Sequence, residues 1–247
     1  MIVNKNPPPL LLSVRECCII IAHNKERQYK MTLTVISDQI NSIFSSFDAS
    51  VLGALHSAAE SAGGVLTPIA RAVTFIGEKG IIFFALALLL IMFKKTRRTG
   101  VCLFGAVCCG ALIGNIILKD LIARPRPLTT EAYSAWWSFV GSPAEDGFSF
   151  PSGHVTAAMA GISALCLSCR RKTMLLGYIY VILMAFSRCY LMAHYPSDVL
   201  CGIIIGGISA VAAFFIAKLI FDLLEKHRSV RLFGAILDFD LPELIKK

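Results

Sequence analysis

Apolar residues gather in five long runs between positions 80 and 217, and short polar or basic segments separate them. The runs cover residues 80–93, 100–118, 151–169, 173–186 and 199–217. A helix needs about 20 apolar residues to cross a bilayer, where only helices or closed barrels satisfy their own backbone. The first run reaches that length only by extending back to Val73, with Glu78 and Lys79 at the membrane interface. The pattern predicts an all-α bundle of transmembrane helices.

Basic residues lie at every second connection between these runs. Lys94 to Arg98 join the first run to the second, Arg170 to Lys172 join the third to the fourth, and Lys226 to Arg231 follow the fifth. Loops rich in lysine and arginine stay on the cytoplasmic side of a membrane. The other connections, residues 119–150 and 188–198, are therefore expected to face outward. This predicts a multi-pass protein of the cell membrane with both of these connections on its extracytoplasmic side.

The N-terminal third of the chain has a weaker pattern. Apolar residues recur there at helical spacing, with polar residues between them: Leu33, Ile36, Ile40, Ile43, Phe44 and Phe47. Such a stretch forms either an amphipathic helix at the membrane interface or a weak additional span, so five and six spans both stay open. We divide the chain into an N-terminal segment (residues 1–50), a transmembrane domain (51–222) and a cytoplasmic C-terminal tail (223–247).

The composition excludes an ordinary soluble domain. Of the 247 residues 56% are hydrophobic and 16% are charged, whereas soluble domains carry about a quarter charged residues. The net charge is +8, but the basic residues border apolar runs. Membrane lipids, and not nucleic acid, are therefore the expected partner. Most of the nine cysteines lie in apolar runs, where cysteine packs as a small hydrophobic residue. No cofactor is expected.

Ionisable and small polar residues gather at the outward ends of the apolar runs. In chain order these are Lys119 and Arg126 after the second run, Ser152, Gly153 and His154 at the start of the third, and Arg188, His194 and Asp198 between the fourth and the fifth. The alternating topology puts all of them at one membrane face. Ionisable residues at membrane depth are functional more often than not. Three cations and two histidines at one face form a natural site for an oxyanion.

These residues resemble the three-block signature of the type 2 phosphatidic acid phosphatase superfamily. The first block, K-x6-R-P, corresponds to Lys119 through Pro127. The second, P-S-G-H, corresponds to Pro151 through His154, and the third, S-R-x5-H-x3-D, to Ser187 through Asp198. Every defining residue is present and the blocks follow in order. The short loops look more like those of bacterial members than of eukaryotic ones, which is an argument by analogy.

The resemblance implies a role for each of these residues. In the superfamily the histidine that matches His194 attacks phosphorus and becomes a transient phosphohistidine. Asp198 would hydrogen-bond this imidazole and fix its tautomer, and His154 would donate a proton to the leaving oxygen. The nonbridging phosphate oxygens would be bound by Lys119, Arg126, Ser152, Gly153 and Arg188.

Taken singly, the same residues also have structural interpretations. His154 could pack at the start of a helix, Lys119 and Arg126 could anchor helix ends at the headgroups, and Asp198 could cap the helix that follows it. The segment RPRP offers two arginines. The K-x6 spacing selects Arg126 and leaves Arg124 as a secondary phosphate or headgroup contact.

The sequence therefore predicts a phosphatase that hydrolyses a lipid phosphate or diphosphate. Phosphatidic acid, phosphatidylglycerophosphate and polyprenyl diphosphates are the substrate classes that we consider. Because no cluster of residues has the spacing of metal ligands, the reaction is expected to be metal-independent. Two alternatives stay open. One is a vanadium haloperoxidase-like enzyme that uses the same anion site, and the other is a non-enzymatic transporter or scaffold that binds an anion.

Overall fold

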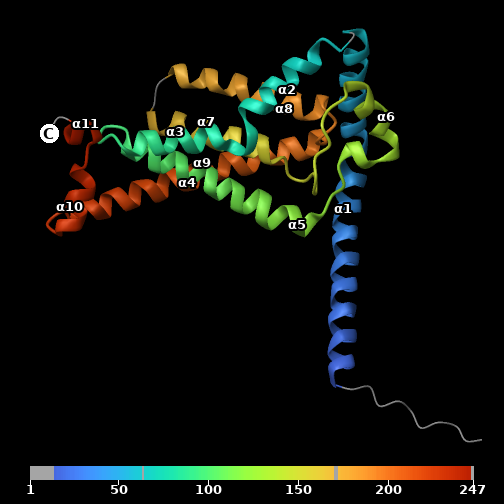
Figure 1. Cartoon of the computed structure of the whole chain (residues 1–247), viewed down its shortest axis with the longest axis horizontal. Helices are drawn as coiled ribbons and strands as arrows, with labels where there is room; N and C mark the ends of the chain where they lie inside the picture. The colour runs from blue at the N-terminus through green and yellow to red at the C-terminus, as the bar shows by residue number, and fades with distance from the viewer. Residues whose placement is uncertain (1–13, 63, 170–171, 246–247) are drawn as a thin grey trace, which may run out of the picture.

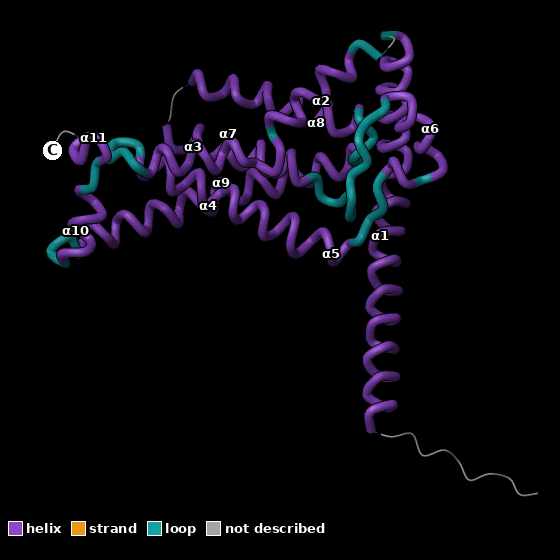
Figure 2. The backbone as a smooth tube through the Cα atoms, in the orientation of Figure 1, coloured by secondary structure: helices purple, strands orange, loops and turns teal. Residues whose placement is uncertain are grey.

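The computed structural model describes residues 14–62, 64–169 and 172–245. Within these residues the ordered elements are helices and no strand occurs (Figure 1, Figure 2). The α-helices are α1 (Val14–Ser61), α2 (Leu66–Ile76), α3 (Ile81–Ile91), α4 (Arg97–Ala111), α5 (Lys119–Ile122), α6 (Glu131–Val140), α7 (Gly153–Cys169), α8 (Gly177–Tyr190), α9 (Pro196–Lys226), α10 (Arg231–Asp238) and α11 (Leu241–Ile245). The prediction of an all-α fold is confirmed.

The predicted apolar runs coincide with the long helical segments. Within the described part of the chain, three segments are long and apolar enough to cross a membrane: Leu66–Ile91, Arg97–Thr129 and Pro196–Lys226. Gly153–Cys169 and Met174–Tyr190 are shorter apolar helices. The first segment starts earlier than the sequence indicates, because a 3-10 turn at Glu78–Gly80 joins α2 directly to α3. The number of spans stays a prediction.

The bundle is held together at small side chains. Helices α4, α7 and α9 pack against one another, α3 packs on α4, and α2 pairs with α8 (Figure 1). The contacts contain several alanines that are almost inaccessible: Ala106, Ala158, Ala160, Ala210 and Ala213. Lipid tails are as apolar as the helices, so the hydrophobic effect does not drive membrane helices together. Small residues instead let the helices approach closely and pack. Large apolar side chains point away from the bundle instead. Phe75 is 79% exposed and Ile182 is 67% exposed, which is typical of a lipid-facing surface.

Helix α1 crosses the end of the bundle at which α6 lies and does not run alongside the other helices (Figure 1). It contacts α5, α8 and α9. Its described side chains differ between its two faces, since Ile43 is 74% exposed whereas Asp48 and Leu52 are buried. The helix predicted from Leu33 to Phe47 is part of α1. Helix α1 continues through residue 50 and α9 through residue 222, so the domain boundaries stay predictions. Residues 1–13 of the first segment lie outside the described part.

The backbones of α7 and α9 come close together at Gly206. A methyl group at this position would lie 2.6 Å from the carbonyl oxygen of Thr156 and 2.9 Å from the backbone nitrogen of Ala160. Both are backbone atoms, so they yield only if one helix shifts against the other. At the neighbouring Gly207 the nearest atom to such a methyl group is Cε of Met159, at 3.6 Å. Gly206 therefore sets the spacing between the two helices that carry His154 and Asp198.

We expect Gly206→Ala to lower the free energy of unfolding by about 1–3 kcal/mol, the usual cost of overpacking a tight contact. Thermal unfolding of the purified protein in detergent measures this as a lower Tm. Gly207→Ala is the matched control. It should leave Tm unchanged or raise it slightly, because the site has room and alanine is less flexible than glycine when unfolded. An equal Tm for the two variants would contradict the proposed spacing role.

Candidate active site

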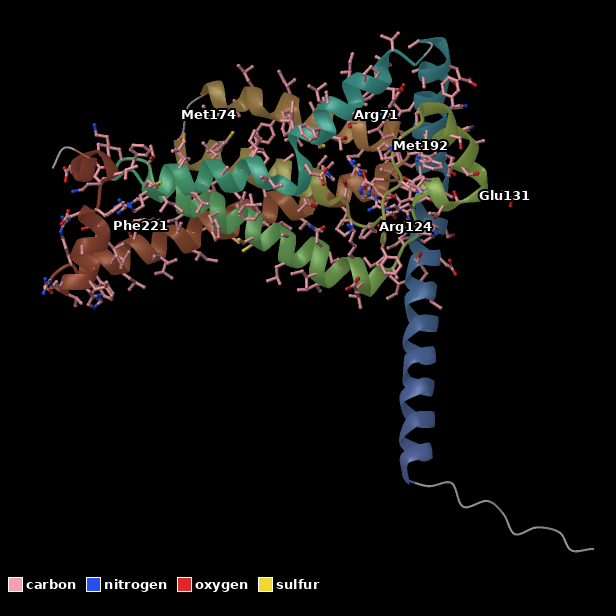
Figure 3. All side chains as sticks on the ribbon, in the orientation of Figure 1. Arg71, Arg124, Glu131, Met174, Met192 and Phe221 are labelled. Carbon is pink, nitrogen blue, oxygen red and sulfur yellow. The ribbon has the colours of Figure 1, made fainter. Side chains whose placement is uncertain are left out.

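A cavity of about 770 Å³ lies between α2, α4, α7, α8 and the loop that follows α6. Figure 3 shows Arg71, Arg124 and Met192 at the end of the bundle where α6 lies, whereas Phe221 lies near the opposite one. Six of the eight site residues predicted from the sequence line the cavity: Lys119, Arg126, Gly153, His154, Arg188 and His194. The other two, Ser152 and Asp198, are fully buried behind its wall. The fold thus brings together residues from all three sequence blocks.

Asp198 is oriented by the start of helix α9. Pro196 is the first residue of the helix, a position where its missing N–H costs nothing. Asp198 follows in the first turn, and its Oδ2 accepts a hydrogen bond of 2.9 Å from the backbone nitrogen of Tyr195. The same oxygen lies 3.6 Å from Nδ1 of His194. At this distance the two groups face each other without forming a hydrogen bond. Such contacts are often long in a free enzyme and shorten in its complexes.

His194 lies between Asp198 and the cavity. Its backbone nitrogen donates to the carbonyl of Arg188 at 3.2 Å, and its Nε2 lies 3.3 Å from Nη1 of Arg126. The side chain is 1% exposed. Burial lowers the pKa of His194 well below its ordinary value, and the charges of Arg188 and Arg126 lower it further. The imidazole is therefore neutral near pH 7, with one nitrogen toward Asp198 and the other toward the cavity.

The three predicted cations reach the cavity from different elements, and Arg71 of α2 lines it as well. Lys119 follows a π-helix at Leu112–Leu118, an irregularity that is frequent at functional sites. The guanidinium of Arg126 is held by backbone carbonyls, donating to Ala193 at 2.9 Å and to Gly147 at 3.1 Å. Arg188 lies in the last turn of α8 and is completely buried. Fixed, poorly hydrated cations of this kind bind phosphate oxygens strongly.

Glu145 occupies the space between two of these cations, and the sequence analysis missed it. Its Oε2 lies 3.0 Å from Nη1 of Arg126, and its Oε1 accepts a hydrogen bond from Arg188. Burial alone would raise the pKa of Glu145, but the charges of Arg188 and Arg126 outweigh it and bring the pKa to about 2. The ionised carboxylate therefore pairs with both arginines inside the cavity. Its loop has no periodic pattern that would have revealed it.

His154 is the second residue of α7 and is partly buried. Its Nε2 lies 3.5 Å from Oε2 of Glu78, which comes from the turn between α2 and α3. Glu78, for which the sequence predicts a place at the membrane interface, lines the cavity. The reason is that α2 and α3 form one segment whose turn points at the site. Glu78 therefore brings a carboxylate next to the imidazole of His154 inside the cavity.

The two small residues of the second block differ in position. Gly153 lines the cavity and opens α7, where the first N–H groups lack partners within the helix. The backbone nitrogen of Ser152 is already used, since it donates to the carbonyl of Asp198 at 3.1 Å. The Ser152 hydroxyl is buried and has no hydrogen-bond partner among the described residues. Ser152 therefore holds α7 to α9 through its backbone, and phosphate binding by its side chain stays a prediction.

Two further residues serve the structure and not the cavity. Ser187 donates to the carbonyl of Ala70 at 2.7 Å and lies 2.5 Å from the hydroxyl of Thr74, so it fastens α8 to α2. Arg124 is 1% exposed and is absent from the cavity lining. The prediction that Arg124 contacts phosphate or a headgroup is wrong. The chain turns at Ala123, which has a φ of 50°, and directs Arg124 toward α1 while Arg126 reaches the cavity.

Comparison with known proteins places this geometry in context. Residues 99–220 match the PAP2 superfamily. The undecaprenyl-diphosphatase of Sulfolobus acidocaldarius is 30% identical over 118 residues, which cover 48% of this chain and 55% of that protein. The decaprenylphosphoryl-5-phosphoribose phosphatase of Mycobacterium tuberculosis is 33% identical over 162 residues, which cover 64% of this chain and 84% of the relative. The chain thus spans about half of the first relative and most of the second.

Solved structures share the fold. The crystal structure of Aquifex aeolicus LpxE superposes with a TM-score of 0.50 at 25% sequence identity, over 60% of this chain and 85% of that one. The transmembrane PAP2 type phosphatidylglycerolphosphate phosphatase from Bacillus subtilis gives a TM-score of 0.54 at 22% identity, over 79% of this chain and 94% of that one. The second likeness supports the helical membrane fold alone.

The position of Glu145 yields a prediction about anion binding. Glu145→Gln removes the negative charge that an incoming anion has to displace from Arg126 and Arg188, while the side chain keeps its size. We expect the inhibition constant of vanadate or inorganic phosphate to fall by about tenfold, because hydrogen bonds between charged groups are the strong ones. Inhibition assays with the purified protein at pH 7 measure this directly.

Glu131→Gln is the control for this substitution, because Glu131 is an exposed residue in the first turn of α6 and its loss changes net charge equally. Its inhibition constants should match those of the wild type. Weaker anion binding by Glu145→Gln would mean that the carboxylate holds the arginines in place and does not compete with the anion.

Proposed function

This chain belongs to the PAP2 superfamily, as the sequence resemblance indicated, and we propose that it is a membrane phosphatase that hydrolyses a lipid phosphate or diphosphate through a phosphohistidine. The observation that carries this proposal is the cavity that Lys119, Arg126 and Arg188 share with His154 and His194. It combines fixed cations for a phosphate with a neutral imidazole and a second imidazole beside a carboxylate.

The proposed reaction has two steps. In the first, Nε2 of His194 attacks phosphorus, the bond from phosphorus to the leaving oxygen breaks, and His154 gives that oxygen a proton. In the second, His154 takes a proton from a water molecule, whose oxygen attacks phosphorus and releases His194 with inorganic phosphate. Asp198 stabilises the positive charge of the phosphorylated imidazole in between. The depressed pKa of His194 supports the first step, because only the neutral imidazole is a nucleophile.

The phosphate would replace Glu145 between Arg126 and Arg188. Negative charge grows on the nonbridging oxygens as phosphorus becomes pentacoordinate, and preorganised cations stabilise that state more than the ground state. Lys119 lines the same cavity and supplies a third positive charge. With three side-chain cations available for this purpose, we propose that the reaction needs no metal ion.

The cavity lining supports an amphiphilic substrate. Besides the charged residues, the wall contains apolar side chains from α2, α4 and α7: Phe75, Val107, Ala111 and Ala157. Phe75 is also largely exposed on the outside of the bundle, so the apolar wall continues toward the lipid. This suits a phosphate that is attached to a hydrocarbon. The two relatives matched by sequence are named for polyprenyl-linked phosphates, which belong to this class, as do phosphatidic acid and phosphatidylglycerophosphate.

We place the cavity on the extracytoplasmic side of a cell membrane that the chain crosses five times. The basic residues after α3 and after α9 lie at the end of the bundle opposite the cavity (Figure 1), and basic loops are cytoplasmic. Helix α1 would then lie in the outer interface, because it crosses the bundle end and exposes apolar residues such as Ile43 and Phe47.

The two histidines are expected to respond differently to substitution. His194→Ala should abolish turnover of every substrate, because no phosphoenzyme can form. His154→Ala should lower turnover of a lipid phosphate by about 10²–10⁴-fold, because an alkoxide leaves poorly without a proton. The same variant should keep much more activity on nitrophenyl phosphate, whose leaving group departs as an anion. Phosphate release by the purified protein measures both, with EDTA present throughout.

Acid quench with labelled nitrophenyl phosphate provides the control, since His154→Ala should still trap a phosphohistidine. A labelled phosphoenzyme in His194→Ala would remove the nucleophile assignment, and equal losses of His154→Ala on both substrates would remove the proton-donor assignment. Turnover that requires magnesium would contradict the metal-free mechanism. A wild-type protein that binds phosphate without releasing any from lipids would favour the transporter or scaffold alternative, and vanadate-dependent halide oxidation would favour the haloperoxidase alternative.

The topology is tested by labelling single cysteines in a chain whose nine native cysteines are replaced. Ala132→Cys places an exposed thiol on α6 near the cavity, and Ser229→Cys places one in the turn between α9 and α10. We expect an impermeant thiol reagent to label Ala132→Cys in intact cells and to leave Ser229→Cys unlabelled until the cells are opened. The opposite pattern would place the cavity in the cytoplasm.

A further inference from the structure

Behind the nucleophile lies a second cluster of charges that the proposed reaction does not use. Arg124 is 1% exposed and donates to four side chains. Its partners and distances are Asn41 at 2.7 Å, Ser197 at 2.8 Å, Asp198 at 2.5 Å and Asp48 at 2.8 Å. The guanidinium also lies 3.9 Å from the ring centre of Tyr195. One arginine therefore connects α1 to the carboxylate that faces His194.

Asp48 completes this cluster from helix α1. It is 2% exposed, and its carboxylate accepts from Arg124 as well as from Ser197, whose backbone nitrogen lies at 2.9 Å and whose hydroxyl lies at 2.7 Å. The Ser197 nitrogen is one of the first donors of α9, which have no partner within the helix. Asp48 thus fastens the start of α9 and holds Arg124 at the same time. It lies outside the stretch that matches the superfamily.

We propose that Asp48 and Arg124 are positioning residues, which fix the carboxylate of Asp198 toward His194 and set the net charge behind the nucleophile. This inference rests on the proposed phosphohistidine reaction. Arg124 binds Oδ1 of Asp198, which leaves Oδ2 for Tyr195 and His194. Without Asp48, the positive charge of Arg124 would cancel the negative charge of Asp198. With Asp48, the three groups carry a net charge of about −1, which stabilises a cationic phosphohistidine at short range.

The proposal concerns the chemical step and not anion binding. The cations that hold the phosphate lie on the cavity side, whereas Asp48 and Arg124 are sealed behind His194. Asp48→Asn keeps the size of the side chain and removes its charge. We expect kcat for a lipid phosphate to fall by about 10–100-fold, while KM and the inhibition constant of vanadate stay within about twofold. Asp38→Asn is the matched control, because Asp38 is exposed on the same helix, and it should retain wild-type kinetics.

The pH profile separates a charge effect from loosened packing. His194 faces Asp198 from α9, and from the cavity side it faces Arg126, Arg188, Lys119 and Glu145. Loss of a nearby negative charge lowers the pKa of the imidazole, so the acid limb of kcat/KM should move to lower pH in Asp48→Asn. Loosened packing would hydrate the imidazole and move the limb to higher pH, because burial is what lowers the pKa of His194. The wild type and Asp48→Asn are assayed with the same substrate, so the ionisation of that substrate contributes equally to both pH profiles.

Arg124→Lys is a second test of the positioning role, and it replaces the first test if Asp48→Asn does not fold. A lysine keeps the charge but lacks the fork that binds two carboxylates at once. It should therefore also lower kcat by at least tenfold with KM unchanged. The proposal fails if a folded Asp48→Asn or Arg124→Lys variant keeps wild-type kcat, or if the acid limb of Asp48→Asn moves upward. A wild-type protein without turnover would instead overturn the proposed function on which this inference rests.

Discussion

Positive charge kept away from bulk water is the constraint on which the rest of this structure depends. Lys119, Arg126 and Arg188 line one cavity, and poorly hydrated cations are costly unless anions accompany them. In the free protein Glu145 supplies that anion to two of the three. Under the proposed function a phosphate would take its place. Substrate binding is then an exchange of one anion for another on cations that are already in position, which limits the reorganisation that the reaction requires.

The charges of a second set stay with their partners and are not exchanged. Asp48, Arg124 and Asp198 are each at most 3% exposed, and Arg124 is paired with both carboxylates. None of the three lines the cavity, so no substrate competes for them. His194 lies between the two sets, with exchangeable charges on its cavity side and permanent ones behind it. Under the proposed function, exchange of Glu145 for a phosphate would leave the charges that orient the imidazole in place.

The sequence was a good guide wherever the pattern is local. Lipid requires long apolar helices, so the apolar runs predicted the helical segments, and the three blocks identified six of the residues that line the cavity. Contacts between distant segments could not be predicted. Asp48 looks like any polar position on an amphipathic helix, although it bonds Ser197, which lies far away in the chain. Glu145 belongs to a loop without periodicity. The K-x6 spacing selected Arg126 over Arg124, but it could not show where the side chain of Arg124 points. That depends on the left-handed turn at Ala123.

Asp198 shows why a structural and a catalytic interpretation of one residue need not compete. The sequence left it as either a helix cap or the partner of a histidine. In the structure Oδ2 of Asp198 accepts a hydrogen bond from the backbone nitrogen of Tyr195, as a capping side chain does. The same oxygen faces His194. The start of a helix fixes a side chain more firmly than a loop does, because its first N–H groups need acceptors. Capping is thus the means by which the carboxylate is aimed, and the bond from Arg124 to the other oxygen keeps it from rotating away.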